Sequence, residues 1–273
     1  MKGIINLLAW AVVIFILFYE AWVNFGFFGI AIVIAAIFGV LYVVFRAQIM
    51  FLKGNARYNT NDKQGAFEIY EKAYLTGRLK PVNSLYYAYL LLRDGKIEKS
   101  EKMIDEISKK YKNVLLKNEK LSIRINKALI KWKKGDLKDA IADAEGIYNE
   151  GVKNTSLYGV LGYWYILDKR YDDALKINEE AHEYNSSDLI IYDNLAQNYF
   201  LVGNKEKSEE MYKDILDKNP DFIEPYYNYG MLVLSNGDKE KAKEYFEKAL
   251  SMEEKFLSTV THDMVRYEIE KIS

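Results

Sequence analysis

Residues 192–204, YDNLAQNYFLVGN, and residues 226–238, YYNYGMLVLSNGD, carry one pattern twice, 34 positions apart. Each has an aromatic residue, a small residue four positions later and a glycine seven positions after that. A fixed period of this length is typical of stacked helical repeats, because each unit is a helix pair that buries its apolar face against the next pair. The sequence therefore predicts an all-α fold.

Extending this register along the chain gives four consecutive units, and two earlier ones fit after a break at residues 115–120. The predicted units are residues 47–80, 81–114, 121–154, 155–188, 189–222 and 223–256. A small residue occupies the eighth and the twentieth position of every unit, where two antiparallel helices must cross closely. The eighth positions are Gly54, Ala88, Ala128, Gly162, Ala196 and Gly230, and the twentieth are Ala66, Ser100, Ala140, Ala174, Ser208 and Ala242.

The fifteenth position predicts where the first helix of a unit ends. Glycine recurs there, and a glycine can take the left-handed backbone conformation that terminates a helix at low steric cost. The glycines are Gly95, Gly135, Gly203 and Gly237. The next residue is often one that caps a turn or a helix, as at Asp62, Asp136, Asn204 and Asp238.

The unit resembles the tetratricopeptide repeat. In residues 189–222 the matching positions are Tyr192, Leu195, Ala196, Tyr199, Ser208, Tyr212, Ile215 and Pro220, and in residues 223–256 they are Tyr226, Tyr229, Gly230, Val233, Ala242, Phe246 and Ala249. The resemblance covers residues 47–256 and implies an α-solenoid of about six helix pairs. A C-terminal capping helix is predicted over residues 257–273. The prediction rests on apolar residues at helical spacing, which are Phe256, Val260, Met264 and Ile269 or Tyr267.

Residues 1–46 differ from the rest of the chain, because Glu20 is the only charged residue between Lys2 and Arg46. Two apolar runs, at about 4–19 and 27–45, are separated by EAWVNFG. One helix through both would be about 65 Å long, roughly twice the hydrocarbon core of a bilayer. We therefore predict a two-span membrane anchor over residues 1–46. A secretory signal peptide is the main alternative, but no small-residue cleavage site follows the first run.

The charges beside these runs predict the orientation. Positive residues precede the first run and follow the second, whereas the connecting turn carries none. The positive-inside rule then places both ends, and the repeats of residues 47–273, in the cytoplasm. The high content of Lys, Asn, Ile and Tyr favours a bacterial source, with the anchor in the inner or plasma membrane. Glu20 fits the membrane interface beside the turn better than a buried functional carboxylate. No helix breaker lies between Ile30 and Asn59, so the second span is expected to continue as the first helix of residues 47–80.

Composition argues against most chemistry. The chain has no cysteine, only two histidines and a formal net charge of −1. No nucleophile, acid–base pair, phosphate-binding loop or metal-ligand spacing is visible, so we expect no enzyme activity, no catalytic residue, no metal and no cofactor. Without an excess of positive charge, nucleic acid is not expected as a partner.

The resemblance implies that the first helices of the units line a concave groove. Aromatic and amide side chains at its exposed positions suit an extended peptide or a partner helix. The alternative for the asparagines is that they only buttress the stack. The predicted groove residues are Tyr86, Tyr89, Asn126, Leu129, Trp132, Tyr163, Asp193, Asn194, Gln197, Tyr227, Asn228 and Met231.

Two functions follow as hypotheses. The first is a membrane-anchored scaffold whose groove holds a protein or peptide near the lipid bilayer. The second is an assembly or stabilising subunit, in which the apolar hairpin makes the main contacts with an integral membrane protein.

Overall fold

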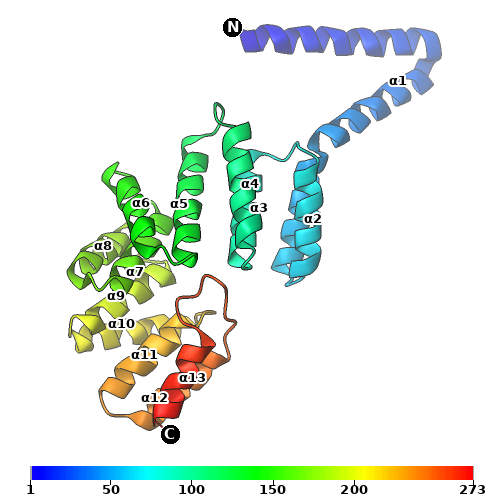
Figure 1. Cartoon of the computed structure of the whole chain (residues 1–273). Coiled ribbons are helices and arrows are strands. Elements are labelled where there is room, and N and C mark those ends of the chain that lie inside the picture. The colour runs from blue at the N-terminus through cyan, green and yellow to red at the C-terminus, as the bar shows by residue number, and fades with distance from the viewer. Residues whose placement is uncertain (1, 273) are drawn as a thin grey trace. The chain divides into compact units, whose positions relative to one another are not determined.

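The structure is a computed structural model that describes residues 2–272, with only the backbone described for residues 2–9 and 11. Every regular element in this range is an α-helix, as the repeat pattern predicts. The chain divides into two compact units, residues 1–84 and 85–273 (Figure 1). The helices are α1 (Lys2–Asn59), α2 (Lys63–Leu75), α3 (Pro81–Arg93), α4 (Ile97–Lys110), α5 (Lys117–Lys133), α6 (Leu137–Asn149), α7 (Thr155–Leu167), α8 (Tyr171–Tyr184), α9 (Leu189–Leu201), α10 (Lys205–Asp217), α11 (Glu224–Ser235), α12 (Lys239–Leu250) and α13 (His262–Ile272).

Helix α1 is interrupted at Gly26, whose φ of 55° and ψ of −139° lie outside the helical region. Figure 1 shows the bend that results. Asn24 donates a side-chain hydrogen bond of 2.8 Å to the carbonyl of Glu20 in the turn before the break. Glycine fits here because the positive φ is costly for residues with a β-carbon. The predicted turn between the apolar runs thus coincides with a real break, and the helix then runs on to Asn59 as expected.

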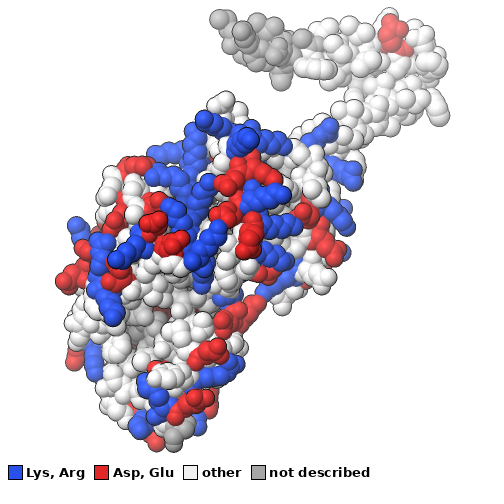
Figure 2. All heavy atoms as spheres, viewed as in Figure 1, with Lys and Arg blue, Asp and Glu red and all other residues white. Residues whose placement is uncertain are grey.

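Many large apolar side chains of α1 are exposed among the residues that the structure describes, as at Phe15, Phe27 and Phe38. Among the described residues one helix, from Val12 to Asn59, is long and apolar enough to cross a membrane, with a mean hydropathy of 2.8 in its most apolar window. In Figure 2 the part of this helix around the bend is almost free of charge apart from one acidic group, whereas the repeats are densely charged. The length and composition suit a membrane segment, and the two-span hairpin stays a prediction.

In residues 1–84, α2 and the segment after it pack on the part of α1 that follows the bend. A β-carbon at Gly54 would lie 2.6 Å from the ring of Tyr70, so the glycine lets this buried ring approach the helix. The Tyr70 hydroxyl donates to Asn55 at 2.6 Å. Arg78 donates to the carbonyl of Val43 at 3.1 Å. The end of α1 is therefore built into the first helix pair.

In residues 85–273, the small residues of the repeats lie where the helices of each pair cross. The Ser100 hydroxyl donates to the carbonyl of Ala88 at 2.7 Å, and that of Ser208 donates to Ala196 at 2.8 Å. Both bonds join the twentieth position of a unit to its eighth. A β-carbon at Gly230 would lie 2.6 Å from the ring of Phe246. The close helix crossing predicted from the sequence is confirmed at these positions.

The fifteenth position takes a left-handed backbone in all six predicted units. The glycines have φ values of 76°, 98°, 89° and 93° at Gly95, Gly135, Gly203 and Gly237, and the non-glycine residues Asn61 and Lys169 have 64° and 60°. Three of the four predicted caps form, because the side chains of Asp62, Asn204 and Asp238 accept backbone N–H bonds. Asp136 makes no such bond.

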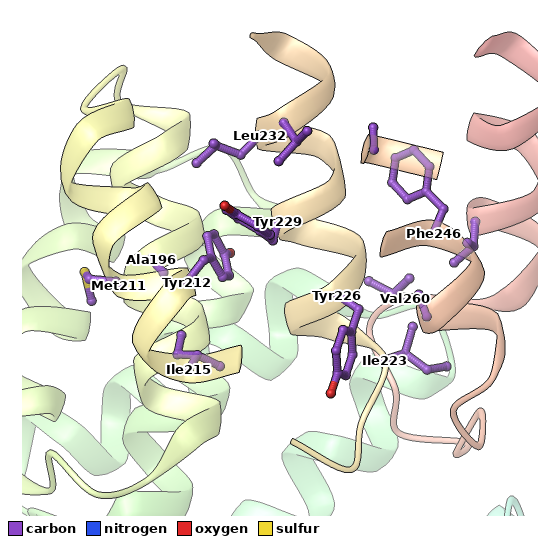
Figure 3. Close-up of a cluster of buried hydrophobic side chains, with 14 of the residues drawn as sticks. Ala196, Met211, Tyr212, Ile215, Ile223, Tyr226, Tyr229, Leu232, Phe246 and Val260 are labelled. Carbon is purple, nitrogen blue, oxygen red and sulfur yellow. The ribbon is translucent and has the colours of Figure 1, made fainter. Parts of the chain in front are cut away.

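The predicted capping helix is wrong in its start and in part of its buried face. Residues 251–261, called here the C-terminal loop, are not helical, and α13 begins only at His262. Thr261 accepts the N–H of Met264, and Glu254 accepts that of His262, so both satisfy the helix start. The core contains Val260 from the loop, beside Ile223 (Figure 3).

Within α13 the buried residues are Val265 and Glu268. Of the residues predicted to face the core, Val260 belongs to it and Ile269 packs against it, whereas Met264 and Tyr267, the alternative to Ile269, are 42% and 60% exposed. The start of the helix at His262 therefore sets a different register from the one that the apolar spacing indicated.

Candidate protein-binding face

The predicted groove asparagines join successive first helices to one another. Asn194 on α9 donates to the carbonyl of Gly159 on α7 at 2.9 Å. Asn228 on α11 donates to the carboxylate of Asp193 on α9 at 3.2 and 3.3 Å. Gln197 on α9 donates to the Asn228 side-chain oxygen at 3.2 Å. Since Asp193, Asn194 and Asn228 are also buried, these three side chains buttress the stack.

Asp193 is an unusual member of this network, because its carboxyl is buried in the protein. Burial raises its pKa well above the usual range, and the neighbouring charge of Glu224 raises it further, against the hydrogen bond from Asn228. Such an environment favours the neutral form of Asp193 and makes it a poor direct contact for a ligand.

The C-terminal loop contacts several first helices, and we call the surface that it covers the inner face. Lys133 at the end of α5 donates to the carbonyl of Ser258 at 3.4 Å. Tyr163 on α7 donates to the carbonyl of Thr259 at 3.5 Å. Glu224 at the start of α11 accepts the Thr259 N–H at 2.6 Å and its hydroxyl at 3.1 Å. Burial raises the pKa of Tyr163 to about 12.

Phe256 is the aromatic contact of the loop with this face. A β-carbon on Gly95, in the turn between α3 and α4, would lie 3.3 Å from its ring. The Lys133 ammonium lies 5.0 Å from the Phe256 ring centre and 4.2 Å from that of Trp132. Burial lowers the pKa of Lys133, while Glu224 and Glu254 raise it. The inner face therefore offers a cation between two aromatic rings beside a carboxylate.

The other predicted groove residues differ in exposure. Trp132 and Tyr163 come together, with ring centres 6.3 Å apart. Asn126 and Leu129 are buried, whereas Tyr86 is 43% exposed. Four more are half-buried: Tyr89, Gln197, Tyr227 and Met231. The groove assignment as a whole stays a prediction.

The sequence analysis missed Lys133, Glu224, Phe256 and Thr259. Glu224 occupies the second position of its unit, which is one of the exposed positions of the resemblance, so the rule already applied to the other residues could have found it. Lys133 lies one position after Trp132 and carries no such signal. The two loop residues were assigned to a helix.

Among the described residues, no group of three or more histidine, cysteine or acidic side chains is placed to hold a metal ion.

The stacked antiparallel pairs define a helical-repeat solenoid, and comparisons with known proteins specify its type. Residues 223–256 match the tetratricopeptide repeat family. A TPR repeat-containing protein of Methanocaldococcus jannaschii is 25% identical over 207 residues, which cover 69% of this chain. The chain spans about a third of that relative's length, at 35%.

Two crystal structures share the fold. A tetratricopeptide repeat protein from Parabacteroides merdae is 15% identical with a TM-score of 0.62, and the match covers 95% of this chain and 98% of that one. A TPR protein from Thermus thermophilus is 18% identical with a TM-score of 0.55 and coverages of 71% and 98%. Together these findings support a tetratricopeptide-repeat protein.

Proposed function

We propose that the protein is a membrane-anchored scaffold whose repeats hold a protein or peptide partner near the bilayer. The observation that carries the binding role is that the inner face already holds a non-helical polypeptide segment, its own C-terminal loop. A surface that satisfies the backbone groups of one segment through Lys133, Tyr163 and Glu224 has the chemistry to bind another.

The anchoring role is supported by α1. Its large apolar side chains are uncovered in the chain, as at Phe27 and Phe28, which are 83% and 77% exposed. A contiguous apolar surface of this kind is typical of a membrane or protein interface. Arg46, Lys53 and Arg57 follow the second apolar run, so we propose that the repeats face the cytoplasm.

A second candidate function places the main partner contact in the membrane. Gly39 has open space around it, since a β-carbon there would meet nothing within 4 Å. Small residues allow helices to approach closely in a bilayer, so this position suits a neighbouring membrane helix. The repeats would then stabilise a complex with an integral membrane protein.

Photocrosslinking in native membranes separates the two functions. A benzoylphenylalanine would replace Tyr86 or Tyr227 on first helices, with Tyr184 on α8 as a control of similar exposure to Tyr86. The scaffold proposal expects a discrete adduct from Tyr86 or Tyr227 and none from Tyr184. Adducts only from Trp10 and Phe15 favour the second function. Equal adducts from Tyr184 and the first-helix positions contradict a specific binding face.

A further inference from the structure

The C-terminal loop is held at its ends and reaches across the inner face between them. The imidazole Nε2 of His262 lies 3.0 Å from the carbonyl of Met252, so the two ends of the loop are close together. Ser258 and Lys255 are joined by two hydrogen bonds, of 2.8 and 3.2 Å, which form a turn within the loop. Closed ends and internal contacts are the features of a compact Ω-loop, a loop type that is frequently functional.

The base and the tip of this loop differ in how they are held. Val260, at the base, is 4% exposed and belongs to the hydrophobic core. The tip, residues 256–259, is half-buried. Two of its polar contacts, from Lys133 and Tyr163, are long at 3.4 and 3.5 Å, and the strongest is the charge-assisted pair of bonds to Glu224. The tip is therefore held by polar contacts and partial burial, whereas the base is fixed in the hydrophobic core.

The groups that hold the tip recognise features that many peptides share. Glu224 accepts one backbone N–H and one hydroxyl, and Lys133 donates to a backbone carbonyl. The aromatic side chain of Phe256 lies three residues before Thr259 and contacts the turn at Gly95. A segment of another protein with an aromatic residue followed by serine or threonine has the same chemistry.

From these contacts we propose that the C-terminal loop is a displaceable internal ligand of the inner face. The partner that replaces it is a segment of another protein with an aromatic residue two or three positions before a serine or threonine. This inference rests on the proposed scaffold function and specifies its ligand and its regulation. Because the loop is part of the same chain, it competes with every external segment, and the apparent affinity falls with the fraction of molecules in which the tip is open.

The test uses the full-length protein in mild detergent and a fluorescent peptide with the sequence EEKFLSTV, residues 253–260. In the variant Phe256→Ala with Thr259→Ala, the tip loses its aromatic contact and its hydroxyl bond to Glu224. We expect this variant to bind the peptide at least tenfold more tightly than the wild type. Adding Glu224→Gln should weaken that binding at least tenfold, and a peptide with alanine in place of phenylalanine should not bind.

Equal affinity of the wild type and the opened variant, or no binding by either, would overturn the proposal. If the variant does not fold, hydrogen exchange of the wild-type protein tests the proposal instead. Hydrogen exchange should be at least a hundredfold faster at the Thr259 amide than at the Val265 amide of α13. If both amides exchange at the same rate, the tip does not open separately and the inference is wrong.

Failure of this inference can be distinguished from failure of the scaffold function. If the peptide does not bind but Tyr86 or Tyr227 still forms a discrete adduct in membranes, the face binds a partner of another chemistry. If neither experiment shows binding, the scaffold function itself is contradicted.

Discussion

The apolar part of α1 and the repeats of residues 85–273 use the same kinds of side chain but differ in what covers them. In the repeats, Phe246 packs over Gly230 and is fully buried. On α1, Phe27 and Phe28 are exposed, and Gly39 faces open space. Burial of apolar area contributes about 25 cal/mol per Å². The repeats gain this from their own neighbouring helices, whereas the exposed apolar side chains of α1 gain none of it in the structure described.

The largest effect is expected where a charge enters the uncovered region. Val12 and Phe38 lie near the middle of the two apolar runs. At the centre of a bilayer an arginine costs about 3 kcal/mol. The double variant Val12→Arg with Phe38→Arg should therefore be largely lost from membranes washed with alkaline carbonate.

The matched control is Phe27→Arg, which lies next to the break at Gly26 and is expected at the membrane surface. It should stay in the membrane fraction like the wild type. Retention of the double variant at wild-type level would show that the apolar runs do not span a bilayer.

A smaller effect is expected from a cavity in the covered region. Phe246→Ala removes a fully buried ring from the core around Tyr227 and Gly230, and such a change costs about 3–5 kcal/mol. Urea unfolding of the full-length protein should show this loss. Tyr267→Ala, on an exposed face of α13, should change stability by less than about 0.5 kcal/mol. Similar losses in both variants would contradict the packing described.

Asp193 provides a pH test of the covered region. Its pKa in the folded protein is raised, so between about pH 4 and that value the folded state binds more protons than the unfolded state. Stability should then fall as the pH rises, by up to about 1.4 kcal/mol per pH unit from this group. Asp193→Asn should remove that part of the slope and be more stable than the wild type at neutral pH. Asp263→Asn, at an exposed carboxylate, is the control and should leave the slope unchanged.

The smallest effect is expected at Lys169, which has a φ of 60° where four other units have glycine. A left-handed backbone costs a residue with a β-carbon roughly 1 kcal/mol. Lys169→Gly should therefore raise the free energy of unfolding by about this amount, and Lys169→Ala should bring no comparable gain. Equal effects of the two substitutions would show that the backbone at this turn is not strained.

The sequence predicts those features of the fold that local geometry imposes on every unit. Helices cross where small residues occupy the eighth and twentieth positions of a unit, as at Gly230 and Ala242. First helices end where glycine occupies the fifteenth position, as at Gly203 and Gly237. Lys169 shows the limit, because its turn has the same conformation without the residue that indicates it. Local patterns therefore predict the helices and most of the turns.

The C-terminal loop could not be predicted in this way. Phe256, Val260 and Met264 have helical spacing, but Val260 packs into the core and Phe256 contacts a turn about 160 residues earlier in the chain. Such contacts join residues far apart in the chain, and no local pattern specifies them. The repeat register marks Trp132 and Tyr163 as exposed positions. It does not mark the neighbouring Lys133, whose role depends on its contact with the loop.

Membrane anchoring by α1 is tested most directly by asking whether a bilayer covers its apolar residues. The chain has no cysteine, so single-cysteine variants can be labelled without background. Phe38→Cys and Ser187→Cys both replace exposed residues, one on α1 and one in the loop between α8 and α9. In open membrane fragments, a soluble maleimide should label Ser187→Cys rapidly and Phe38→Cys only after detergent is added. Labelling of both at the same rate before detergent would contradict membrane anchoring.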